Sequence, residues 1–146
     1  MKDRLMTDLK EAMKARNPEK VASIKSVRQA VIGFEKDNPG KELNEEVYAS
    51  LIDGLIKTRT KSIEEYTKAD RLDLAEPEQV EIDYIKVYLP ERVDENTIKE
   101  AALAIQIETS ASSMKDMGMM MGKLKAKFGA TAKPADISRI VKEILS

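Results

Sequence analysis

The chain has 146 residues and contains neither cysteine nor histidine. These absences exclude disulfide bonds, Cys/His zinc sites, Cys–His nucleophile pairs and Ser–His–Asp triads. We expect no metal and no cofactor. Aromatic residues make up only 4% of the sequence, which is low for a β-rich core and leaves few rings for stacking single-stranded bases.

Long hydrophobic runs are also missing. No apolar stretch approaches the roughly 18 residues that a membrane-spanning helix needs. The chain begins with the charged stretch MKDRLMTDLK, where a secretion signal would be hydrophobic. We therefore expect a cytoplasmic protein without membrane association.

Charge is nearly balanced in total but unevenly distributed. The 25 Lys/Arg and 26 Asp/Glu residues give a net charge of −1. Residues 1–96 hold 17 bases and 21 acids, whereas residues 97–146 hold eight bases and five acids. Between Lys115 and Lys142 there are seven bases and two acids. A basic C-terminal third of this kind attracts anions.

Apolar residues recur at spacings of three and four in seven segments, and no hairpin signal or alternating strand pattern occurs. The sequence therefore predicts an all-α fold. Pro18, the stretch DNPG at 37–40 and Pro90 separate helices. We expect an N-terminal bundle of about four helices in residues 1–92 and a C-terminal three-helix unit in residues 93–146.

Helix starts can be predicted from capping residues. Asn44 and Asp94 are plausible N-caps, and Ser113 followed by Asp116 resembles a capping box. Proline suits the first turn of a helix but not its interior, so Pro77 is expected only near the start of the fourth helix.

The stretch SSMKDMGMMMGKLKAKFG, residues 112–129, combines methionines, lysines and glycines. On a helix, one apolar stripe of Met114, Met117, Met121, Leu124 and Phe128 would pack inward. A copper(I) site of converging thioethers is disfavoured, because the best-spaced methionines are also the best core candidates. Gly118 and Gly122 permit a close backbone approach, either by a packed neighbouring helix or by a phosphate.

Basic residues in and after this stretch are candidates for contacts with nucleic-acid phosphates. The set comprises Lys115, Lys123, Lys125, Lys127, Lys133, Arg139 and Lys142. If the apolar stripes of the last three helices face inward, several of these cations share an outer surface. The alternative is a solvated basic face without a partner. With so few aromatics, recognition of folded RNA by shape and phosphate is favoured over single-strand stacking.

A second cationic group lies earlier in the chain and contains Lys57, Arg59 and Arg71. Ion pairing is the default interpretation, with Arg59 bonded to a carboxylate such as Asp73 or Glu81. These three residues are second-rank site candidates.

Catalytic motifs are weak. Ser112 and Lys115 have the spacing of a serine–lysine dyad, but the companion S-D-N and K-T-G motifs are absent and Ser113 is better used as a cap. We assign no catalytic residue.

Three blocks of sequence together resemble the GatB/YqeY family, in its stand-alone YqeY-like form. They are LKEAMKARNPEKVASIKSVRQAV, KTRTKSIEEYTKADRLDLAEPEQVEIDYIKVYLPE and SSMKDMGMMMGKLKAKFGA. The resemblance implies a helical bundle followed by a three-helix unit like the tail of the B subunit of tRNA-dependent amidotransferases. In those enzymes the tail touches tRNA. By association, the family is linked to carbon–nitrogen ligase activity with glutamine as nitrogen donor.

Residues and resemblance together favour a non-catalytic accessory that binds tRNA or aminoacyl-tRNA through the C-terminal basic unit, with a possible protein partner in tRNA amidation. The alternative is a protein-interaction module without RNA, in which exposed Met119 and Met120 and the acidic body dock onto a partner enzyme. A third hypothesis is a carbon–nitrogen ligase or amidase in its own right.

Overall fold

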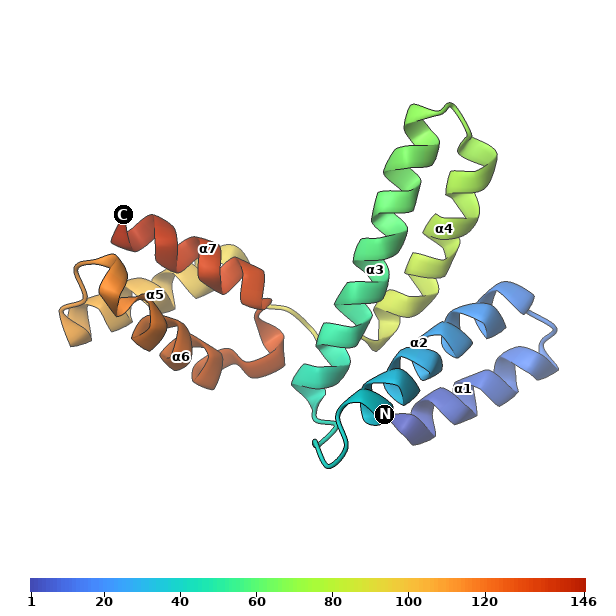
Figure 1. Cartoon of the computed structure of the whole chain (residues 1–146), viewed down its shortest axis with the longest axis horizontal. Coiled ribbons are helices and arrows are strands. Elements are labelled where there is room, and N and C mark those ends of the chain that lie inside the picture. The colour runs from blue at the N-terminus through green and yellow to red at the C-terminus, as the bar shows by residue number, and fades with distance from the viewer. The chain divides into compact units, whose positions relative to one another are not determined.

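The computed structural model describes residues 1–146 as seven α-helices and three short 3-10 turns, without a strand. The predicted all-α fold is confirmed (Figure 1). No helix has the length and apolar character required to cross a membrane.

The chain divides into two compact units, Met1–Leu89 and Pro90–Ser146. The division lies shortly before the boundary expected after Arg92. The N-terminal unit contains α1 (Lys2–Lys14), α2 (Pro18–Asp37), α3 (Glu45–Lys68), α4 (Leu72–Ile85) and a 3-10 turn at Lys86–Tyr88. The C-terminal unit contains α5 (Glu95–Thr109), a 3-10 turn at Met114–Asp116, α6 (Met117–Phe128), a 3-10 turn at Gly129–Thr131 and α7 (Pro134–Leu145).

In the N-terminal unit the helices form two antiparallel pairs, α1 with α2 and α3 with α4 (Figure 1). The joint between α1 and α2 is short because Arg16 adopts the left-handed conformation, with φ of 53°, and because the side chain of Asn17 caps α2 by accepting from the Lys20 backbone N–H at 3.2 Å. The core draws on all four helices and the turn that follows them. Its fully buried members include Leu5, Ile24, Val27, Ile52 and Ile85.

Pro77 lies farther inside α4 than the sequence suggests. The helix begins at Leu72, so Pro77 occupies its second turn and cannot donate a backbone hydrogen bond there. Its ring is exposed. Leu89 lies outside α4, because the chain tightens into the 3-10 turn Lys86–Tyr88 before it reaches Pro90.

The C-terminal unit is a three-helix arrangement with its own core. The helix caps follow the predicted pattern. Asp94 accepts from the Thr97 backbone N–H at 2.8 Å at the start of α5, and the carboxylate of Asp116 accepts from the backbone N–H groups of Ser112 and Ser113 at 3.0 and 3.3 Å. Residues that pack in this core are Ile98, Ala101 and Ala102 of α5, Met120 and Leu124 of α6, and Ile137, Ile140, Val141 and Leu145 of α7.

Candidate nucleic-acid interface

Helix α6 is oriented by a methionine that the predicted stripe omitted. Met120 and Leu124 are both 0% exposed, and Met117, Met121 and Phe128 pack half-buried beside them. Met120 precedes Leu124 by one helical turn, and this spacing is the sequence signal that could have found it. The prediction that Met120 is exposed is therefore wrong. The proposed docking surface of Met119 and Met120 loses one of its two methionines. Met119 alone remains exposed, at 37%.

Met114 does not belong to the stripe. The α-helix begins only at Met117, and Met114 lies in the preceding 3-10 turn, where its side chain is 45% exposed. A 3-10 turn has three residues per turn instead of 3.6, so helical spacing cannot be extrapolated through it.

Of the two approaches expected at Gly118 and Gly122, that of a packed neighbouring helix is not present in the structure. Both glycines are exposed, and a Cβ atom built on either would meet no atom within 4 Å. The physical reason is the inward position of Met120, since residues on the other side of the helix must face outward. Together with exposed Ala126, the two glycines form a smooth outer ridge of α6, which we call the small-residue ridge.

Three lysines flank this ridge. At 100° per residue, Lys123 and Lys127 fall on one flank of α6 and Lys125 falls on the other. Lys115 extends the series into the turn before the helix. All four side chains are exposed, and none has a carboxylate oxygen within the 4.0 Å of an ion pair. The lysines of α6 therefore lie on both sides of the small-residue ridge instead of sharing a single face.

The lysine charge is local to α6. Residues 90–146 hold nine Lys/Arg and eight Asp/Glu, a net charge of only +1. Residues 115–128 hold four lysines and a single acid, Asp116. That acid is engaged by backbone N–H groups. The positive potential of this unit is thus concentrated on the outer side of one helix.

Arg139, predicted to contact phosphate, is already paired. Its guanidinium donates to Glu95 Oε1 at 2.5 Å and lies 3.6 Å from Asp136 and 3.8 Å from Glu143. The hydrogen bond to Glu95 is the main cause of the raised pKa of Arg139. Three carboxylates around one guanidinium would repel a phosphate, so the structure removes Arg139 from the predicted set.

The remaining two lysines of the set lie on α7. Lys133 is the N-cap residue of this helix and Lys142 lies in its last turn. Both are exposed and neither has an ion-pair partner. Lys142 lines a shallow hollow of about 550 Å³ with Arg139 and Glu143, so acidic groups accompany it. Neither lysine belongs to the α6 ridge.

Two of the second-rank candidates are committed to ion pairs. Arg59 is 13% exposed, and its Nε lies 2.8 Å from Glu81 Oε2. A second nitrogen of the same guanidinium donates to Ser26 Oγ at 3.0 Å. The expected pairing of Arg59 with a carboxylate such as Glu81 is confirmed, and it ties α2, α3 and α4 together.

Arg71 binds Asp73 within one exposed turn at 3.1 Å, and this hydrogen bond lowers the pKa of Asp73. Only Lys57 of the second-rank group is exposed without an ion-pair partner.

A polar cluster around Tyr88 was missed by sequence reasoning. The Tyr88 hydroxyl donates to Asp8 Oδ2 at 2.5 Å, and the Arg4 guanidinium lies 4.7 Å from the centre of the Tyr88 ring. Burial, followed by the bond to Asp8, raises the pKa of Tyr88. Both contacts join a residue of α1 to Tyr88, so this cluster holds α1 against the 3-10 turn that follows α4. No local spacing pattern connects residues 8 and 88.

The possible serine–lysine dyad is not assembled. No hydrogen bond joins Ser112 to Lys115, and both side chains are exposed. No group of three or more carboxylates has the geometry to hold a metal ion.

Comparison with known proteins gives one family match. The family described as Yqey-like protein matches residues 2–145. Similar proteins include three named "Altered inheritance of mitochondria protein 41, mitochondrial". The protein from Pyrenophora tritici-repentis is 29% identical over 145 residues, which cover 97% of this chain and 79% of the relative. The protein from Lachancea thermotolerans is 40% identical over 85 residues, covering 58% of this chain and 46% of the relative. The protein from Kluyveromyces lactis is 33% identical over 135 residues, covering 84% and 72%.

The names of these relatives place them in mitochondria. This finding contradicts the cytoplasmic location expected from the sequence. The expectation relied on the charged first ten residues and on the lack of an apolar run, and neither feature distinguishes the cytoplasm from the mitochondrion.

Proposed function

The chain belongs to the YqeY-like protein family, and from that premise we propose that its C-terminal unit binds the phosphate backbone of a folded RNA of the tRNA class. The protein acts as an accessory without catalysis of its own. An aminoacyl-tRNA handled by a tRNA-dependent amidotransferase is the form of RNA that the family resemblance suggests. The observation that carries the proposal is the set of four exposed lysines without an ion-pair partner around the small-residue ridge of α6; Lys127 also lies over the Phe128 ring, 5.8 Å from its centroid.

The shape of α6 suits a double-stranded RNA region. A-form RNA has a wide, shallow minor groove with a phosphate strand on each side. Because Gly118, Gly122 and Ala126 carry almost no side chain, the helix backbone can come close to the floor of this groove along the ridge, with the exposed side chain of Met119 beside it. Lysines on both flanks of the ridge then reach one phosphate strand each. Lysine ammonium groups act as point charges, so the contacts require no particular base sequence.

Single-stranded RNA fits this surface less well. Phe128 is the only aromatic residue in residues 90–146, and it is half-buried against the core. No exposed ring is therefore present in this unit for a base to stack on, and stacking supplies much of the affinity of single-strand binders. Structured RNA should bind more tightly than an unstructured strand of equal length.

A matched pair of variants tests the proposal. Lys123→Gln, Lys125→Gln and Lys127→Gln together remove the flanking charges of α6. Lys41→Gln, just before α3, with Lys61→Gln and Lys68→Gln on α3 together remove the same charge from exposed positions, and this is the α3 variant. Binding of labelled total tRNA to the full chain is followed by fluorescence anisotropy at low salt. We expect the α6 variant to lose about 10²-fold in affinity or more, and the α3 variant to lose less than about threefold. Equal losses in both variants, or no binding by the unmodified chain, would overturn the proposal.

A further inference from the structure

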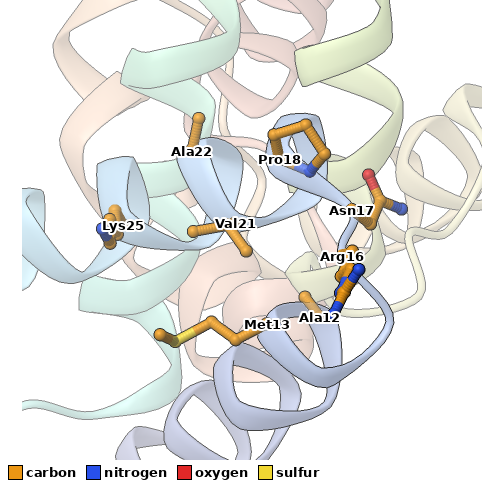
Figure 2. A pocket seen from close by; sticks show the side chains of 8 residues that line it. All are labelled: Ala12, Met13, Arg16, Asn17, Pro18, Val21, Ala22 and Lys25. Carbon is orange, nitrogen blue, oxygen red and sulfur yellow. The ribbon is translucent and has the colours of Figure 1, made fainter.

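The N-terminal unit carries an apolar hollow where α1 and α2 meet. Figure 2 shows Met13 of α1 and Val21 of α2 lying in the space between the two helices, with Arg16 at the joint and Lys25 farther along α2. The hollow has a volume of about 590 Å³, and Ala12 contributes to its apolar lining. Its surface is thus hydrophobic, with basic side chains along its edge.

A second hollow continues along the same face of the helix pair. It has a volume of about 290 Å³ and is lined by Met6 of α1 and by Arg28 and Ile32 of α2, above buried core residues. Val21, Lys25, Arg28 and Ile32 are spaced by four, three and four residues, which places all of them on one side of α2. The two hollows therefore lie in line along the side where α1 and α2 meet, and we call them together the α1/α2 groove. From Val21 to Ile32 it runs for about 16 Å at the helical rise of 1.5 Å per residue.

The groove exposes three large apolar side chains. Met13 is 58% exposed, Ile32 is 50% exposed and Met6 is 41% exposed. Single exposed hydrophobic residues are common, but three in line between the same two helices indicate a binding surface. Methionine side chains are flexible and polarisable, so they can adapt to a partner's surface.

The charge along the groove is positive and uncompensated. Arg16, Lys25 and Arg28 have no carboxylate oxygen within 4.0 Å. At the far end, Lys2 pairs with Glu35 at 2.8 Å, so these two charges cancel. Asp3 is the one other acid in the lining of the two hollows. An occupant that is apolar in the middle and acidic at its edges would bury the methionines and neutralise the three bases.

We propose that the α1/α2 groove binds an acidic amphipathic helix of a partner protein. Two neighbouring helices form a trough into which a third helix packs along its length, with anchors at i, i+3 or i+4, and i+7. The 16 Å length of the groove accommodates about three turns of such a helix. A nucleic acid fits less well, because it would leave Met6, Met13 and Ile32 uncovered and no aromatic side chain lines either hollow for a base to stack on. The residues of the groove belong to Met1–Leu89, whereas the lysines of α6 belong to Pro90–Ser146. This inference therefore does not depend on RNA binding.

A designed peptide serves as the probe. It has about 15 residues, long enough to form a helix with suitable end groups, with leucines at i, i+3, i+4 and i+7 and glutamates on both flanks. One control peptide has the same composition in scrambled order. A second control replaces the glutamates by lysines. Binding to the full ¹⁵N-labelled chain is followed by chemical-shift changes of the backbone amides, and affinity is measured by anisotropy of labelled peptide.

The expected result is saturable binding of the acidic amphipathic peptide alone, with shift changes concentrated in residues 2–35. The double variant Lys25→Glu, Arg28→Glu should weaken its affinity about tenfold or more, because the new carboxylates repel the glutamates. A control with Lys57→Glu and Lys61→Glu on α3 should change affinity less than about twofold.

Three outcomes would overturn the proposal. They are equal binding of the scrambled peptide, shift changes outside the groove, and unchanged affinity in the Lys25→Glu, Arg28→Glu variant. Concentration-dependent self-association that is lost on Met13→Glu would assign the groove to a second copy of this chain instead, and would likewise refute a partner helix. RNA binding by the unmodified chain is measured in parallel, so that a failure of peptide binding can be told apart from a failure of RNA binding.

Discussion

Replacement of Met120 by alanine tests the orientation of α6, on which the exposure of its lysines depends. Met120 is 0% exposed in the core of the C-terminal unit, whereas Met114 is 45% exposed. The two substitutions remove the same atoms from the same stretch of chain. Only their burial differs, so Met114→Ala is a matched control for Met120→Ala.

The expected cost follows from burial. Truncating a fully buried methionine to alanine costs about 2–5 kcal/mol, because it loses transfer free energy and leaves a cavity. Surface substitutions stay within about 0.5 kcal/mol. The C-terminal unit spans 57 residues, and at roughly 0.05–0.15 kcal/mol per residue its free energy of unfolding is about 3–9 kcal/mol. Met120→Ala should therefore remove a large part of that stability and lower the Tm of this unit by about 10 °C or more.

The assay must report on the C-terminal unit itself, because the two units can unfold separately. Methionine methyl resonances of Met117 and Met121, which pack against this core, supply such a signal during urea unfolding of the full chain. Equal destabilisation by Met114→Ala and Met120→Ala would refute the inward position of Met120. The small-residue ridge would then no longer face outward.

Three further predictions concern stability. Gly122→Ala should stabilise the chain by up to about 1 kcal/mol in urea unfolding, because alanine favours the helix and its Cβ meets open space; destabilisation would indicate a neighbour at that position. Arg59→Met should cost about 2–3 kcal/mol in the N-terminal unit, since it leaves the partly buried carboxylate of Glu81 unpaired, and the loss should shrink in the double variant with Glu81→Met. The pKa of Asp94 is lowered chiefly by its hydrogen bond from the Thr97 backbone N–H, so the charged cap stabilises α5 fully above the ordinary carboxyl pKa of about 4, and this contribution is lost as pH falls through the lowered pKa. Asp94→Ala should lower the urea midpoint of the C-terminal unit at neutral pH and lower it less in acid, and a pH-independent loss would exclude this cause.

Helix number and helix caps followed from local patterns. Asn44 and Asp94 cap α3 and α5 as expected, because a cap is made with residues three positions away in the sequence. The burial of Met120 was missed for the opposite reason. Four methionines lie between positions 117 and 121, so several registers of the stripe look alike. Packing against α5 and α7 selects one of them.

The pairing of charges could not be derived from spacing alone. Arg139 meets Glu95 across two helices, and Tyr88 meets Asp8 although they are 80 positions apart. Only the tertiary fold brings such residues together. The lysines of α6 differ because no acidic residue within a helical turn of Lys123, Lys125 or Lys127 is present in the sequence. The absence of ion pairs at these lysines could therefore have been predicted from the sequence, whereas the pairing of Arg139 with Glu95 could not.

The most direct test of RNA binding by α6 is the salt dependence of tRNA affinity. Each neutralised phosphate contributes about 0.7–0.9 to the slope of log affinity against log salt concentration, so four lysine contacts predict a slope of about −3. The Lys123→Gln, Lys125→Gln, Lys127→Gln variant, which keeps Lys115, should show a slope of about −1. A slope near zero for the unmodified chain, or the same slope for the chain and this variant, would contradict phosphate binding by the lysines of α6.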